Sequence, residues 1–132
     1  MAPPSNVIRV LFVILVLHVS GALAGCGDGG SEAQRRGVGG ACATDPDCRE
    51  GLTCLSFKGG YCGLAECQND AACPVGSACV VHTDGKNYCF LVCNDKPQCN
   101  LFRAVEVEAN CSSSVTFVEG KLDVKACVPP SG

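Results

Sequence analysis

Thirteen cysteines are the residues of this chain whose type and spacing can do chemistry. Twelve of them form three quartets, which are Cys42, Cys48, Cys54 and Cys62; Cys67, Cys73, Cys79 and Cys89; and Cys93, Cys99, Cys111 and Cys127. The first two quartets share the frame Cys-x2-Asp-x2-Cys-x2-Gly-x2-Cys, and each closes on Tyr-Cys. No Cys-x2-Cys occurs, which argues against zinc, a haem attachment site or a redox-active pair. We therefore expect disulfides, no metal and no cofactor.

The composition indicates a fold that is held together by these disulfides rather than by a large apolar core. The chain has 132 residues, no Trp, one Met and sixteen Gly, so it is poorly suited to enclosing a large apolar core. Small units of this kind are usually held together by disulfides. We predict a small disulfide-rich fold of short β-hairpin units in tandem, with little regular secondary structure and no large core. The units are residues 42–66, 67–92 and a divergent 93–132.

Each unit is expected to form a hairpin between its third and fourth cysteines, with two-residue turns at Gly59-Gly60, Asp84-Gly85 and Glu119-Gly120. Across such a turn, an odd number of intervening residues places the two cysteines on opposite faces, which disfavours a bond between them. First-to-third with second-to-fourth pairing then competes with first-to-fourth with second-to-third. We prefer the former, although a three-residue bulged loop would reverse the parity.

Two aspartates and two glycines occupy matching places in the first two units. Asp45 and Asp70 stand three residues after the first cysteine, where we expect each to cap local backbone N–H groups. Calcium binding by Asp45 with Asp47 is the alternative, but two carboxylates supply too few oxygens. Gly51 and Gly76 should adopt a positive φ or approach another part of the backbone closely.

The N-terminus indicates export. Residues 1–25 read as a signal peptide, with a basic Arg9 and an apolar Val10–Val19 run that is too short to span a bilayer. Leu23-Ala24-Gly25-Cys26 resembles the lipobox of bacterial lipoproteins, in which cleavage precedes a cysteine that is then lipidated. Cys26 is also the one cysteine outside the quartets, which accounts for the odd count. Ordinary cleavage after Ala24 is the alternative.

Residues 26–41 are predicted to be the lipidated cysteine and a flexible Gly-rich tether. The protein would be exported and anchored by lipid in a bacterial cell envelope, at the outer membrane. A formal net charge of −3 argues against a nucleic-acid partner.

The frame in Cys42 to Cys93 resembles the cysteine-rich modules typified by the Dickkopf N-terminal domain, which recur in lipoproteins of some Gram-negative bacteria. Its Cys-x2-Asp-x2-Cys opening is also similar to four-disulfide-core proteins, although the adjacent cysteine pair of that family is missing. The resemblance implies a disulfide-stapled extracellular module and carries over no active site.

These observations favour a non-catalytic lipoprotein that presents a recognition or adhesion surface to an extracellular protein or glycan. The candidate contact residues lie at the hairpin ends and are Phe57, Lys58, His82, Thr83, Asp84, Lys86 and Asn87. We assign no catalytic residue, because no anchored nucleophile stands near His82 in the sequence. A secreted protease inhibitor or ligand of the four-disulfide-core type and a structural envelope component are the alternatives.

Overall fold

The computed structural model describes residues 30–131, and within that range no helix has the length and apolar character needed to cross a membrane. The predicted signal peptide and Cys26 lie outside the described residues. The strands are β1 (Thr53–Leu55), β2 (Tyr61–Gly63), β3 (Ser77–Val81), β4 (Asn87–Cys93), β5 (Asn110–Ser112), β6 (Thr116–Phe117) and β7 (Lys125–Val128). The short helices are α2 (Glu32–Arg35), α3 (Lys96–Cys99) and the 3₁₀ turns η1 (Asp45–Asp47), η2 (Asp70–Ala72) and η3 (Val105–Val107).

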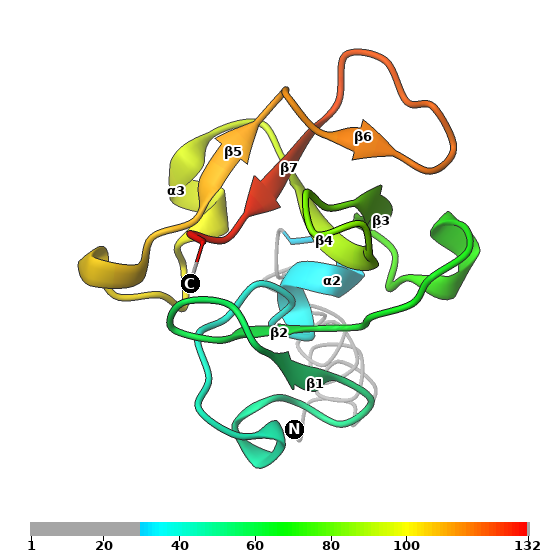
Figure 1. Cartoon of the computed structure of the whole chain (residues 1–132). Coiled ribbons are helices and arrows are strands. Elements are labelled where there is room, and N and C mark those ends of the chain that lie inside the picture. Colours follow the sequence, from blue (N-terminus) through cyan, green and yellow to red (C-terminus); the bar gives the residue numbers. More distant parts are fainter. Residues whose placement is uncertain (1–29, 132) are drawn as a thin grey trace, which may run out of the picture.

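The strands form two antiparallel sheets (Figure 1). β1 and β2 make the hairpin of the first unit, while the second and third units share one sheet of order β5-β7-β4-β3-β6. The chain is therefore a small disulfide-rich protein built from short antiparallel strands, as the sequence predicts. The sheet shared by the second and third units was not predicted, because tandem hairpins would leave these two units separate.

One cluster of buried residues connects all three units. Tyr61 of the first unit and Phe90 of the second are fully buried, and Ala126 of the third is buried with them. The ring centroids of Tyr61 and Phe90 lie 5.1 Å apart. The core is small, but it is continuous across the unit boundaries.

The hairpin turns differ from the predicted two-residue type. In the second unit the His82 amide donates to the Lys86 carbonyl at 2.8 Å, so the loop between them is Thr83, Asp84 and Gly85. Gly85 has φ +80°, which suits the last position of a three-residue bulged loop. In the first unit the ladder ends at Leu55 and Tyr61, which also leaves an odd-numbered loop.

The predicted hairpin of the third unit is wrong. β6 does not pair with the residues that follow Glu119-Gly120; it pairs with β3, so that Phe117 lies opposite Val80. Only 6% of Phe117 is exposed there, because it is covered by the sheet of the second unit. The hairpin partners in the third unit are instead β5 and β7.

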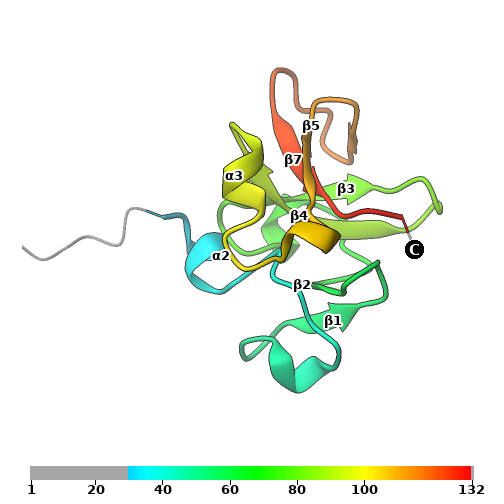
Figure 2. The same ribbon diagram turned by 90° about the vertical axis from the view of Figure 1, so that its left-hand side faces the viewer.

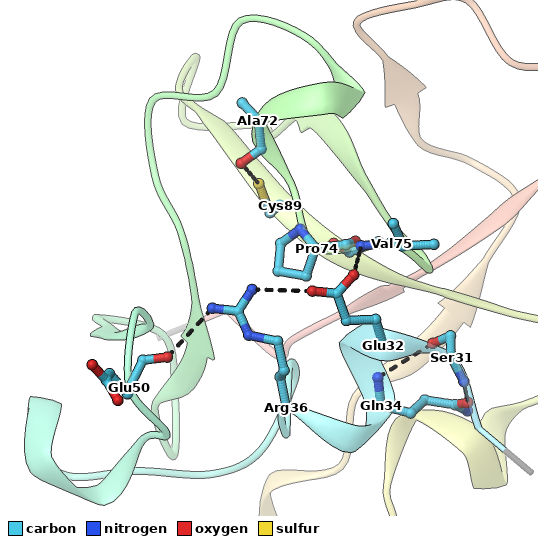
Figure 3. A network of polar contacts seen from close by, with 10 residues as sticks. Ser31, Glu32, Gln34, Arg36, Glu50, Ala72, Pro74, Val75 and Cys89 are labelled. Atoms are coloured by element: carbon cyan, nitrogen blue, oxygen red, sulfur yellow. Dashed lines mark hydrogen bonds and ion pairs between the residues drawn. The ribbon is translucent and has the colours of Figure 1, made fainter. Parts of the chain in front are cut away.

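The predicted tether is also wrong for its described part. Ser31 and Gln34 form a capping box that starts α2, and Ala33 and Val38 are buried. The Ala33 amide donates to the Val75 carbonyl at 2.8 Å, and Figure 3 shows this first helix set against Val75 of the second unit. The segment therefore folds against the body in spite of its high glycine content.

The two glycines at matching places in the first two units behave as expected. Gly51 has φ +81° and Gly76 has φ +95°. A Cβ on Gly76 would also lie 2.2 Å from the Ser31 side chain, so α2 can dock only against a residue without one.

Candidate binding site

Six disulfides hold the strands and surface loops of the three units in place. They are Cys42–Cys54, Cys48–Cys62, Cys67–Cys79, Cys73–Cys89, Cys93–Cys111 and Cys99–Cys127. Every unit thus pairs its first cysteine with its third and its second with its fourth, which is the preferred pairing. The Cα atoms of the two cysteines in each disulfide lie 5.3 to 5.9 Å apart, which is within the usual range.

The pairing is right, but the parity argument for it is wrong. The third and fourth cysteines of each unit stand directly opposite each other in the ladders, as Cys79 and Cys89 do. They share a face because the loops are odd-numbered. Each of them bonds instead to a cysteine of the preceding arm, where a short helical turn lies between the first and second cysteines of the unit.

The predicted caps are confirmed for the two matching aspartates. Asp45 Oδ1 accepts from the Cys54 amide at 2.8 Å, and Asp70 Oδ1 accepts from the Cys79 amide at 2.8 Å. Each carboxylate thereby ties the arm to the third cysteine of its own unit. In the third unit Asp95 caps the first turn of α3 by accepting from the Gln98 amide instead.

Asp70 also joins the second unit to the third. Its Oδ2 lies 2.8 Å from Lys121 Nζ, and its amide donates to Glu119 Oε2 at 2.9 Å. Burial opposes ionisation of Asp70, but Lys121 and the Cys79 amide outweigh it and hold the pKa of this carboxyl below its ordinary value. This contact fastens the segment after β6 beside η2.

The loop between β3 and β4 is organised by Asp84. Its carboxylate accepts from the Lys86 amide at 2.9 Å and from the Tyr88 hydroxyl at 2.8 Å. These donors, the Lys86 amide foremost, lower the pKa of Asp84, whereas burial and then Asp84 itself raise the pKa of Tyr88 to about 12. Asp84 is therefore an anchor of the loop, with its side chain 40% exposed.

An aromatic cluster lies beneath this loop. Phe57 packs edge-on against His82 and Tyr88, with both centroid distances 5.1 Å. Tyr88 and Phe90 stack with an interplanar angle of 6°. The His82 Nδ1 is buried without a hydrogen-bond partner, although Asp84 Oδ1 lies 3.4 Å away.

A hollow of about 320 Å³ opens beside the cluster, between the β3–β4 loop and the C-terminal strands, and we call it the loop hollow. It is lined by Val80, Val81, His82, Thr83, Phe90, Ser112, Ser114, Val115, Thr116, Val128 and Ser131. Its volume is in the range of small-ligand sites. Aliphatic groups and hydroxyls dominate the lining and no carboxylate, lysine or arginine contributes, so it is suited to a neutral, hydrogen-bonding group.

The predicted contact residues do not form one surface. His82 and Thr83 line the loop hollow, whereas Phe57 packs inside the aromatic cluster. The Asn87 side chain donates to the Cys67 carbonyl at 2.9 Å. The remaining three are exposed in the structure and lie outside the lining, namely Lys58, Asp84 and Lys86.

Sequence reasoning missed the half of the loop hollow that the third unit supplies. Ser114, Val115 and Thr116 reach it because β6 crosses to the edge of β3. No local pattern indicates that crossing, since Phe117 and Val80 are far apart in the sequence.

No protein-family model, curated protein or solved structure matches this chain. What the structure does show is a small disulfide-rich protein of short antiparallel strands and hairpins.

Proposed function

We propose that this chain is an exported, lipid-anchored protein of the bacterial cell envelope that binds an extracellular protein or glycan without catalysis. The observation that carries the proposal is the cysteine balance. The six disulfides engage every cysteine in residues 30–131, so Cys26 has no thiol partner within the described part of the chain. A lipobox-like Leu23-Ala24-Gly25-Cys26 gives that remaining cysteine a chemical role.

An acyl chain on Cys26 would anchor the protein firmly. A diacylglyceryl group on sulfur together with an N-acyl chain supplies three hydrocarbon tails, and two membrane signals already suffice for stable anchoring. The folded body would then be displayed at the membrane surface with its loops fixed by disulfides, which lowers the entropy that ordering them on binding would cost.

The loop hollow is the proposed recognition site. Its Ser114 and Thr116 hydroxyls can both donate and accept hydrogen bonds, and Val81 and Val115 offer apolar contact. This lining favours a neutral segment of a protein or a neutral glycan over an anionic ligand.

The anchor is tested by expressing the full chain in a Gram-negative host with a clickable palmitate analogue. Label and the mass of a processed, triacylated N-terminus are expected on the parent, and both should vanish in Cys26→Ser. A parent whose intact mass corresponds to cleavage after Ala24 with an unmodified Cys26 would refute the lipoprotein assignment.

Recognition is tested by glycan-array and peptide-array binding of the purified chain. Ser114→Arg should abolish any captured signal because the new side chain fills the loop hollow. Ser113→Arg is the matched control, since Ser113 is exposed and does not line this hollow. Equal binding by the two variants would place recognition elsewhere.

A further inference from the structure

Five residues form a patch on the side of the molecule where the described chain begins, and we call it the anchor-side patch. They are Arg35, Arg36, Arg49, Leu101 and Phe102. Arg35 belongs to α2, Arg49 follows η1, and Phe102 stands in the loop between α3 and η3. Figure 2 shows this loop beside α2, on the side where the described chain begins.

Contacts join these three segments into one surface. The Ala41 amide donates to the Phe102 carbonyl at 3.0 Å. Arg35, Arg49 and Phe102 line a shallow hollow of about 370 Å³, and Arg49 and Phe102 also line a neighbouring one of about 170 Å³ together with Arg36. Arg35, Arg36, Arg49 and Phe102 therefore share one continuous surface, and Leu101 adjoins Phe102 in the chain.

The patch combines apolar and cationic groups that remain accessible. Leu101 is 63% exposed and Phe102 is 57% exposed, which is unusual for two adjacent large apolar side chains in a chain this small. Arg35 and Arg49 are exposed as well, and neither makes an ion pair within residues 30–131, although Arg35 Nη1 donates to the Gly30 carbonyl.

Three other cations of the described chain are engaged in ion pairs or hydrogen bonds, whereas Lys58 and Lys86 are exposed. Lys96 pairs with Glu108, and Lys121 pairs with Asp70. Arg103 donates to the carbonyls of Lys58, Gly39, Gly60 and Val107.

Two carboxylates beside the patch are engaged by neighbouring groups, although only Glu32 has a cationic partner. Glu32 Oε1 lies 3.6 Å from Arg36 Nη1, and Asp47 accepts from the Ala43 and Thr44 amides. Figure 3 shows Arg36 between Glu32 and the Glu50 carbonyl, so Glu50 stands at the edge of the patch.

The position of Cys26 in the sequence indicates that the partner of this patch is a membrane surface. Cys26 stands four residues before Gly30, so at most about 14 Å of chain separates the two. Because the segment after Gly30 is folded rather than a long tether, a lipid on Cys26 would hold this side of the body at the membrane. Arginines and exposed apolar side chains suit the interfacial region of a bilayer with anionic lipids.

We propose that the anchor-side patch lies on an anionic phospholipid surface, with Leu101 and Phe102 among the headgroups and Arg35 and Arg49 against lipid phosphates. The proposal rests on the acylation of Cys26 proposed above. It orients the molecule, because Figure 2 shows α2 and the β3–β4 loop at opposite ends. The loop hollow then faces away from the membrane.

A tryptophan probe tests the contact directly, since the chain contains no tryptophan of its own. The chain from residue 26, carrying Cys26→Ser and an N-terminal hexahistidine tag, is attached to vesicles of phosphatidylcholine, nickel-chelating lipid and phosphatidylglycerol. Phe102→Trp should show a blue-shifted emission and quenching by brominated lipid. Leu122→Trp, at an 86% exposed position on the loop after β6, is the control and should show neither.

Charge variants test the electrostatic part without the tag. For the untethered Cys26→Ser chain, Arg35→Gln and Arg49→Gln should each weaken binding to phosphatidylglycerol vesicles about fivefold. Glu50→Gln should strengthen it, and none of these variants should bind neutral vesicles more tightly than the parent.

The outcomes separate this proposal from the acylation of Cys26. If the probe at position 102 is no more blue-shifted or quenched than the probe at 122, the patch does not contact the membrane, whatever the mass of the native N-terminus shows. If the native N-terminus is unacylated, the anchor fails even where the tagged chain binds vesicles.

Discussion

The hydroxyl of Tyr61 donates to the Cys127 carbonyl at 3.2 Å and accepts from the Leu91 amide at 3.0 Å. Tyr61 belongs to the first unit, Leu91 to the second and Cys127 to the third. The phenol is fully buried, and burial raises its pKa far above the ordinary value of 10.0. One neutral side chain therefore joins the three cysteine units through the core.

Tyr61→Phe should lower the free energy of unfolding by about 2–5 kcal/mol, because it leaves the buried Leu91 amide and the buried Cys127 carbonyl without their hydrogen bonds to the hydroxyl. Guanidinium denaturation of the oxidised protein measures the loss. Tyr88→Phe is the matched control: it removes a hydrogen bond to Asp84, whose carboxylate remains accessible to water, and should cost about 1–2 kcal/mol. Equal costs for the two variants would contradict the role given to Tyr61.

The Asp70–Lys121 pair should make stability depend on pH. Because the pKa of Asp70 is lower in the folded state than its ordinary value of 3.8, the pair stabilises the protein above that value. The contribution is lost as the pH falls through the folded pKa. Asp70→Asn, which keeps an acceptor for the Cys79 amide, should flatten this acid-side decline in denaturation curves.

Lys121→Met should flatten the same decline, and the double variant should add little to either single one. Additive effects of the two substitutions would show that the carboxylate and the ammonium act separately.

Removing the Cys99–Cys127 bridge, which spans a separation of 28, should cost about 3–4 kcal/mol on a chain-entropy basis. Removing Cys42–Cys54, with a separation of 12, should cost about 3 kcal/mol. Paired substitutions to alanine and chemical denaturation measure both losses. Non-reducing peptide mapping checks the pairing itself, and a peptide linking Cys99 to Cys111 would refute it.

His82→Phe should leave stability unchanged or raise it by up to about 1 kcal/mol, because it removes a buried ring nitrogen that has no hydrogen-bond partner. The new ring can keep the edge-on contact with Phe57. Thermal unfolding measures the effect. A large destabilisation would mean that His82 forms a hydrogen bond or ion pair with Asp84 in solution.

The local features of each cysteine unit could be predicted from the sequence. The capping role of Asp45 and Asp70 and the positive φ of Gly51 and Gly76 depend on short spacings that repeat in two units. The disulfide pairing matches the preferred one, but the parity of the spacings does not account for it, because the chain uses odd-numbered loops, which a Gly-containing turn also permits.

Contacts between units could not be predicted. The crossing of β6 depends on burying Phe117 beside Val80, and the folding of the N-terminal segment depends on burying Ala33 and Val38. Burial of this kind is decided by distant partners rather than by local composition. Ser31 and Gln34 did carry a local signal, since Ser-x2-Gln is the pattern of a capping box.

Interleaved bridges also bear on how the protein would survive proteases. Every peptide bond from Cys42 to Cys62, from Cys67 to Cys89 and from Cys93 to Cys127 is spanned by at least one disulfide. A single cut in any of these stretches leaves both fragments covalently joined. Between the first and last bridges, only the short links after Cys62 and after Cys89 would let the molecule come apart, and both are held by backbone hydrogen bonds.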